Sequence, residues 1–131
     1  IKDNDTSVSL SAYVVKDNIT HGEFKELPKD KQAKPFHFSD GSTIYHQSDR
    51  QLAMLFKEII EDGIYFRNGI TLAENSLVLD IGSNIGTFSI DVNMRQPSAT
   101  ILAFEPIPQI FSGLKKNFEH REINGLVFNY G

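Results

Sequence analysis

The period of the apolar positions changes along the chain, and each period predicts a different element. From Leu77 to Leu79 the apolar residues are continuous, which is typical of a buried strand. A glycine-containing turn follows, and apolar side chains then recur at helical spacing as far as Val92. Another apolar run and another helical stripe come next. From residue 76 the order is therefore strand, helix, strand, helix, strand, which calls for parallel strands and right-handed crossovers.

Prolines and glycines set the bounds of these elements. Pro97 closes the first helix, and the second strand is predicted over Thr100–Glu105. Pro108 lies where a helix can begin, with a buried stripe that runs to Phe118. The third strand is predicted over Gly125–Tyr130. Ligands of such sheets bind at the carboxyl ends of the strands.

The N-terminal third follows other periods. Val8–Val15 alternates between apolar and polar residues, which predicts a half-buried strand. Residues 16–34 show no clear period and are predicted as a loop. The segment Phe36–His46 is predicted as a hairpin with a two-residue turn at Asp40 and Gly41.

That turn sets the predicted pairing of the hairpin. Phe38 would face Thr43, and Phe36 would face Tyr45, so that these four side chains share one face and belong to the core. A helix should then begin at Ser48, which fits a capping box. Its apolar stripe comprises Leu52, Leu55, Phe56, Ile59 and Ile60, and Gly63 is the expected C-terminal cap. We expect the hairpin and this helix to pack together beside the core sheet, over the entrance to the ligand site.

Composition narrows the range of functions. The 131 residues have a net charge of −4, 40% hydrophobic residues and no cysteine. This profile suits one globular domain. The negative charge gives no basic surface for nucleic acid, and the lack of cysteine excludes disulfides and thiolate metal sites. No apolar run approaches the ~18 residues of a membrane span, and the four histidines lack metal-ligand spacing. We expect a cytoplasmic protein, and the first residue, Ile1, suggests a piece of a longer one.

The turn after the first core strand reads D-x-G-x-N-x-G, from Asp80 to Gly86. The dinucleotide fingerprint and the P-loop both fail, because Asn84 and Thr87 stand where these motifs need glycine. Glu105 ends the next apolar run, and an acid at the end of a second parallel strand can accept both hydroxyls of a ribose. The spacing therefore favours a nucleotide cofactor that is not bound in the NAD manner.

These motifs resemble the FkbM-type class of S-adenosylmethionine-dependent methyltransferases. The resemblance rests on VLDIGSNIGTFS and AFEPIPQIFSGLKKNF, with LAMLFKEIIEDGIYFRNGI upstream, and covers the chain from about Gln51 onward. It implies an α/β, Rossmann-like methyltransferase fold, truncated after about three core parallel strands. On this basis residues 1–47 form an extension with the strand, loop and hairpin, and residues 48–131 form an incomplete cofactor-binding core. The implied reaction is methyl transfer from S-adenosylmethionine, usually to oxygen.

The residues that match the motifs give the predicted cofactor site: Asp80, Gly82, Ser83, Asn84, Gly86, Glu105 and Pro106. Glu105 is expected to hold the ribose, and Asp80 to lie near the methionine amino group by ordering the turn. These residues also have interpretations without a cofactor. Asp80 could be a cap, the glycines turn formers, Pro106 a packing residue, and Glu105 an exposed acid at a helix start. No general base is assigned, although Tyr13, His46 and Asp49 could approach an acceptor from the N-terminal side.

Two other functions stay open from the sequence. A truncated domain could bind the cofactor, or only keep the fold, without catalysis. A nicotinamide-dependent oxidoreductase is less favoured because its fingerprint is missing. For a methyltransferase, the expected substrate is a small-molecule or carrier-bound hydroxyl compound, with no nucleic acid and no membrane as partner.

The resemblance also predicts an open sheet edge. In the family's sheet, the strand that carries the glycine motif pairs on its far side with a strand that this chain lacks. The edge of residues 77–80 would then be short, apolar and without protecting charges. We expect Val8–Val15, a second copy in a homodimer or strand exchange, or a separate C-terminal half to cover it.

Overall fold

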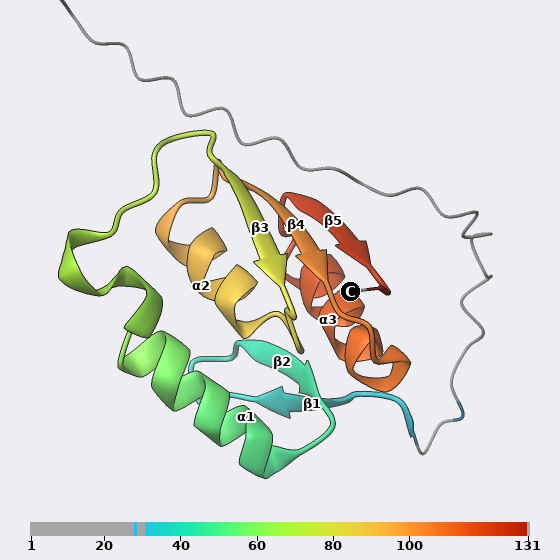
Figure 1. Cartoon of the computed structure of the whole chain (residues 1–131). Coiled ribbons are helices and arrows are strands. Elements are labelled where there is room, and N and C mark those ends of the chain that lie inside the picture. The colour runs from blue at the N-terminus through green and yellow to red at the C-terminus, as the bar shows by residue number, and fades with distance from the viewer. Residues whose placement is uncertain (1–27, 29–30, 131) are drawn as a thin grey trace, which may run out of the picture.

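The computed structural model describes Pro28 and residues 31–130. The predicted strand Val8–Val15, Tyr13 and most of the predicted loop over residues 16–34 lie outside the described residues. Figure 1 shows a parallel sheet with helices α2 and α3 beside it, and a hairpin and helix α1 near one end of its strands. The predicted boundary between residues 47 and 48 stays a prediction.

The strand–helix alternation predicted from residue 76 is confirmed. Its elements in chain order are β3 (Leu77–Ile81), α2 (Thr87–Arg95), β4 (Thr100–Phe104), α3 (Pro108–His120) and β5 (Gly125–Phe128). The three strands are parallel, in the order β3-β4-β5. In this register Asp80 lies opposite Ala103, and Phe104 lies opposite Phe128. The fold is therefore α/β and Rossmann-like, with three core strands.

The core lies on one face of this sheet. Ile101 and Ala103 of β4 are fully buried, as is Leu114 of α3, and Ile90 of α2 joins the same apolar cluster. Two successive right-handed crossovers in one direction place both helices on one side of a sheet. The alternation along β4 then turns every second side chain toward α2 and α3.

The opposite face and the outer edge of β3 are bare among the described residues. Leu77 is 64% exposed, Leu79 43% and Ile81 69%. Leu126 of β5 is 61% exposed as well. No strand of the described chain pairs with the outer side of β3. Parallel sheets are normally covered on both faces, whereas in the described chain helices cover one face of this sheet and leave the other exposed.

The hairpin forms, but its predicted two-residue turn is wrong. The strands β1 (Lys34–His37) and β2 (Thr43–His46) pair with Phe36 opposite Ile44 and His37 opposite Thr43. The loop holds three residues between Phe38 and Ser42, closed by the Phe38 amide on the Ser42 carbonyl at 2.9 Å. Gly41 takes a left-handed φ of 85°, as expected in a type I turn followed by a bulge.

The register shift of one residue corrects the predicted faces of the hairpin. Ile44, which is buried, now shares a face with Phe36, whose ring also contacts that of His46. Tyr45 lies on the other face, where its ring meets the His120 ring of α3 at 5.8 Å. A one-residue slip exchanges the two faces of a strand, so Tyr45 does not join the predicted cluster. The rest of that cluster forms: the Phe36 and Phe38 rings lie 5.0 Å apart, and Phe38 packs on Phe56 of the helix stripe at 4.9 Å.

The helix predicted from Ser48 is confirmed in position and in its caps. The Ser48 hydroxyl accepts a hydrogen bond from the backbone amide of Gln51 at 3.3 Å. The helix α1 (Asp49–Leu55) continues as a π-helical segment, η2 (Phe56–Glu61). Gly63 has the left-handed φ of 59° expected of a C-terminal cap. A 3₁₀ segment, η3 (Ile64–Gly69), then lays aromatic rings against Phe88 of α2.

Candidate functional site

The carboxyl ends of β3 and β4 bring the two predicted motifs together. Asp80 and the glycine turn follow β3, and Glu105 follows β4. The backbone amide of Asn84 donates to Glu105 Oε2 at 3.0 Å, so the two motifs are in direct contact. This juxtaposition is the expected one, because ligands of open parallel sheets bind at this end of the strands.

Three residues of the turn lie in the left-handed region. Gly82 has a φ of 74°, Asn84 of 53° and Gly86 of 83°. Asn84 tolerates this conformation because its own Oδ1 accepts the Ile85 amide at 2.9 Å. The turn is also fixed to β4, since the amides of Gly82 and Ser83 both donate to the Phe104 carbonyl, at 3.0 and 2.9 Å. The backbone of the turn is thus held in place by many local bonds.

Glu105 is a buried carboxylate, 5% exposed. Its Oε1 accepts the Ile107 amide at 2.9 Å, and its Oε2 accepts the Asn84 amide. The alternative interpretation as an exposed helix-start acid is therefore wrong. Each carboxylate oxygen has two lone pairs, so one on each oxygen stays available to a pair of ligand hydroxyls.

Asp80 is buried beneath the turn at 7% exposure. The Ser89 hydroxyl donates to Asp80 Oδ2 at 2.6 Å and thereby ties the end of β3 to α2. Burial raises the pKa of the Asp80 carboxyl, and the bond from Ser89 opposes that rise. In this structure the Asp80 side chain holds the start of α2 to the end of β3, and its predicted place near the methionine amino group stays a prediction.

The raised pKa makes the stability of the fold pH-dependent. The native state holds the Asp80 proton more tightly than the unfolded chain, so this contribution to stability is lost as pH rises from the ordinary carboxyl pKa of 3.8 through the raised value. Asp80→Asn cannot ionise and should lose less stability than the wild type over that range. Thermal melts of both proteins at several pH values check this, and parallel curves would contradict it.

Two predicted site residues have clear duties within the fold. The Ser83 hydroxyl donates to the Asp80 carbonyl at 2.6 Å and accepts the Phe104 amide at 2.8 Å. Gly86 lies against α3, where an added Cβ would meet Leu114 Cδ1 at 2.7 Å. Packing is thus a sufficient reason for glycine at this position. A cofactor contact by Ser83 or Gly86 stays a prediction.

Gly82 and Pro106 form the open part of the site. Both are exposed, and a Cβ added to Gly82 would meet no atom within 4 Å. Packing therefore does not explain this glycine, although its left-handed φ favours one. Contact of Gly82 or Pro106 with a cofactor stays a prediction.

Comparison with known proteins agrees with this geometry. Over 88 residues the chain is 34% identical to the 31-O-demethyl-FK506 methyltransferase FkbM of Streptomyces tacrolimicus, covering 67% of this chain and 34% of that protein. The chain is homologous to the FkbM-type methyltransferases. It is also 33% identical over 90 residues to Methyltransferase 1 of Beauveria bassiana, covering 67% of this chain and 35% of that protein.

The chain spans about a third of the length of these two FkbM-type relatives. A third relative is AMB antimetabolite synthetase AmbE of Pseudomonas aeruginosa, 39% identical over 77 residues, which are 59% of this chain and 4% of AmbE. A crystal structure from Pyrococcus horikoshii, assigned as a transferase, shares the fold with a TM-score of 0.50 at 16% identity, covering 76% of this chain and 37% of that one. No model of a known protein family matches the chain.

Of the residues proposed on the acceptor side, His46 and Asp49 lie in the described part of the chain. His46 Nε2 lies 3.5 Å from Asp49 Oδ1, but the His46 side chain is only 2% exposed. Its ring packs against Phe36, so it is a packing residue and does not approach an acceptor. Asp49 is exposed and pairs with Lys34 at 3.0 Å.

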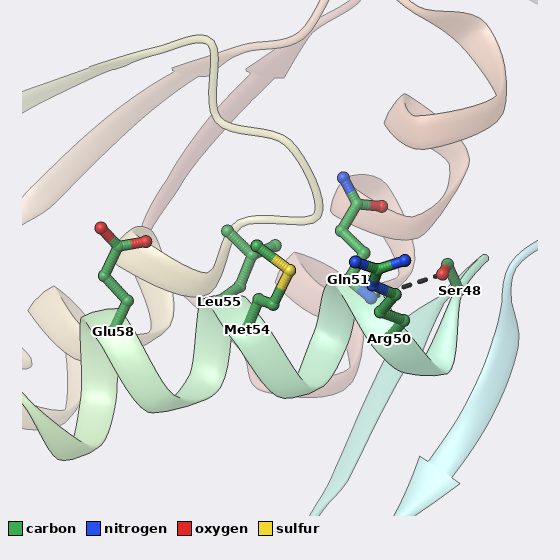
Figure 2. A pocket seen from close by; sticks show the side chains of 6 residues that line it. All are labelled: Ser48, Arg50, Gln51, Met54, Leu55 and Glu58. Atoms are coloured by element: carbon green, nitrogen blue, oxygen red, sulfur yellow. Dashed lines mark hydrogen bonds between the residues drawn. The ribbon is translucent and has the colours of Figure 1, made fainter.

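A shallow hollow of about 430 Å³ lies along α1. Figure 2 shows its lining side chains, which come from α1, its cap and the start of η2: Ser48, Arg50, Gln51, Met54, Leu55 and Glu58. None of the predicted cofactor residues lines this hollow. We assign it no part in cofactor binding.

Sequence reasoning missed a polar residue on the buried face of α3. Asn117 is fully buried and bonds to both the hairpin and the glycine turn. Gly113, one turn earlier, lets the Tyr45 carbonyl approach α3, because a Cβ there would lie 3.3 Å from it. A glycine and an asparagine four residues apart within an apolar stripe were the available signal.

The described part of the chain lacks two other kinds of feature. Within it, no group of three His, Asp or Glu side chains is placed to hold a metal ion. None of its helices is long and apolar enough to cross a membrane.

Proposed function

We propose that this chain is the cofactor-binding part of an S-adenosylmethionine-dependent methyltransferase. The single observation that carries the proposal is the contact between the two motifs, in which the buried Glu105 carboxylate accepts the amide of Asn84 in the glycine turn. Homology to FkbM-type methyltransferases supports the same reaction class. The whole activity is proposed for a longer protein, because the chain spans about a third of those relatives.

In this proposal Glu105 receives the ribose hydroxyls, and Gly82 and Asn84 lie along the methionine part. Pro106 flanks the adenine. The bound cofactor would supply a methyl group already activated on a sulfonium. The residues of this chain bind and orient, and the enzyme gains from alignment of donor and acceptor and from exclusion of water.

The proposed acceptor is an oxygen on a small molecule or on a carrier-bound intermediate. The names of two relatives support this class: one is an O-demethyl-FK506 methyltransferase and the other is an antimetabolite synthetase. A hydroxyl acceptor needs a group that takes its proton. Among the described residues we assign no such group, and a cytoplasmic location stays an expectation from the sequence.

Calorimetric titration of the chain with S-adenosylhomocysteine and, separately, with NAD tests the proposal. We expect binding of the first and none of the second, because the turn lacks the glycines at the third and sixth positions of the dinucleotide fingerprint. Binding of NAD alone would replace the proposal with oxidoreductase chemistry. Binding of neither would favour a structural module.

Gly82→Val should abolish binding of S-adenosylhomocysteine, because the new side chain would fill the open space beside the turn. Gly41→Val in the hairpin loop is the matched control. Gly41 also has a positive φ, 85° against 74° for Gly82, and neither added Cβ would meet an atom within 4 Å. Both variants therefore bear similar backbone strain, and only one blocks the site. Equal affinities in the two variants, measured by calorimetry, would contradict the proposed place of the cofactor.

A further inference from the structure

Asn117 of α3 joins two segments that are distant in the chain. Its Oδ1 accepts the Tyr45 amide at 2.7 Å, and its Nδ2 donates to the Tyr45 carbonyl at 2.9 Å. The same Nδ2 donates to the Ile85 carbonyl at 2.8 Å. One fully buried amide thus satisfies both backbone groups of a hairpin residue and one carbonyl of the glycine turn.

The Ile85 carbonyl belongs to the last peptide of the glycine turn. That peptide joins Ile85 to Gly86, and the residues on either side of Ile85, Asn84 and Gly86, both have positive φ. Its other end, the Gly86 amide, donates to the Ser83 carbonyl at 2.8 Å. Asn117 and Ser83 therefore fix the orientation of this peptide from both sides, and without Asn117 only the local bond remains.

The rest of α3 is shaped to hold the hairpin in this position. Gly113 leaves room for the Tyr45 carbonyl, and Arg121 Nη2 donates to the Thr43 carbonyl at 3.2 Å. Gln47 Nε2, just after β2, donates to the Gln109 carbonyl. Figure 1 shows the resulting arrangement, with β2 between α1 and the lower ends of β3 and α3.

We propose that Asn117 is a positioning residue that couples docking of the hairpin to the cofactor-binding form of the glycine turn. This inference rests on the proposed function and goes beyond it, because no hairpin residue belongs to the predicted cofactor site. Coupling is reciprocal: a ligand that favours the ordered turn must also favour the docked hairpin. The docked hairpin then contributes to the affinity of the site for its ligand.

The test uses Asn117→Ala in the whole chain, with Ile101→Val as a control. Ile101 is fully buried in β4, and its truncation should lower the melting temperature slightly without touching the turn. We expect Asn117→Ala to weaken binding of S-adenosylhomocysteine by about 5-fold to 150-fold, the usual range of coupling between sites. The control should bind as the wild type does at a temperature where both are folded.

A second measurement does not depend on any ligand. In ¹H–¹⁵N spectra of the free protein, Asn117→Ala should shift the amides of Gly86 and Tyr45, whereas Ile101→Val should leave both in place. If the wild type binds no S-adenosylhomocysteine, the proposed function fails, and these shifts still decide whether Asn117 sets the turn. Unchanged affinity and unchanged Gly86 shifts in folded Asn117→Ala would overturn the inference.

Asn117→Asp serves if the alanine variant does not fold. A protonated Asp can accept the Tyr45 amide and donate one hydrogen bond, whereas the ionised form can only accept. We therefore expect the Gly86 shift of this variant to move toward the wild-type value as the pH is lowered. A Gly86 shift with the same pH profile in variant and wild type would contradict the role of Asn117.

Discussion

Glu105→Gln should weaken binding of S-adenosylhomocysteine by at least ~10-fold, because charge-assisted hydrogen bonds are worth roughly 1.5–3 kcal/mol each at a buried site. The substitution keeps the shape of the side chain and removes its charge and half of its acceptor capacity. Calorimetry on the folded variant gives the affinity directly.

The structure changes what this substitution should do to stability. From the sequence alone, removal of the Glu105 side chain was expected to leave folding almost unchanged. Its carboxylate accepts the amides of Asn84 and Ile107, so Glu105→Ala would leave two partly buried donors without their partner. That expectation is therefore revised: Glu105→Ala should lower the melting temperature clearly, and Glu105→Gln less so.

A control separates lost affinity from lost stability. Ile101→Val weakens the core of β4 and keeps both motifs intact, so it should lower the melting temperature and leave the affinity unchanged. If Glu105→Gln is folded and binds S-adenosylhomocysteine as tightly as the wild type, Glu105 does not hold the ribose. If Ile101→Val also loses affinity, the weaker binding of Glu105→Gln reflects lower stability of the fold and not a lost contact with the ribose.

In solution, this chain by itself should associate through the bare side of its sheet. We propose a second copy as the partner, in a homodimer or by strand exchange, because an apolar strand edge with unpaired amides and carbonyls is a template for another chain. The outer edge of β3 has no partner among the described strands, and Leu77 is 64% exposed on the bare face beside this edge. Light scattering should therefore give a mass above the 14.8 kDa of one chain.

Leu77→Lys should reduce this association without a loss of stability, because its side chain is largely exposed already. Met94→Lys on α2 is the matched control, since Met94 is 61% exposed against 64% for Leu77. The control places the same charge on a helix away from the open edge. We expect it to leave the mass of the associated species unchanged.

Two outcomes would contradict a partner copy. A monomer whose β3 amides exchange slowly would show that a segment of the same chain covers the edge, and Val8–Val15 is the predicted strand outside the described residues. A monomer whose β3 amides exchange freely would show that the edge stays bare. Hydrogen exchange read at the Leu79 amide, which points away from β4, distinguishes these cases.

The sequence by itself determined the elements of the core and their order. The apolar run before Asp80 and the glycines after it specify a strand and a left-handed turn by local sterics, and the structure shows both. The end of β4 at Phe104 likewise placed Glu105 beside the turn, because carboxyl ends of parallel strands share one edge. These features depend on short-range rules and on one rule of topology.

The hairpin shows where local rules end. Asp40 and Gly41 are compatible with turns of two and of three residues, and the chain takes the three-residue form with Gly41 left-handed. Which form wins depends on what each face meets. The observed register buries Ile44, whereas the predicted one would have turned Phe36 and Tyr45 inward together.

Only the tertiary structure decided the surroundings of the site. The side-chain amide of Asn117 forms hydrogen bonds with Tyr45 and Ile85, which are 72 and 32 positions away in the chain. The periodicity of apolar residues does not predict such partners. Glu105 likewise reads as an exposed or a buried acid until the two strands are placed side by side. Hydrogen bonds and packing between distant segments form only when the chain is folded, so a pattern of residue types predicts the elements and leaves these contacts open.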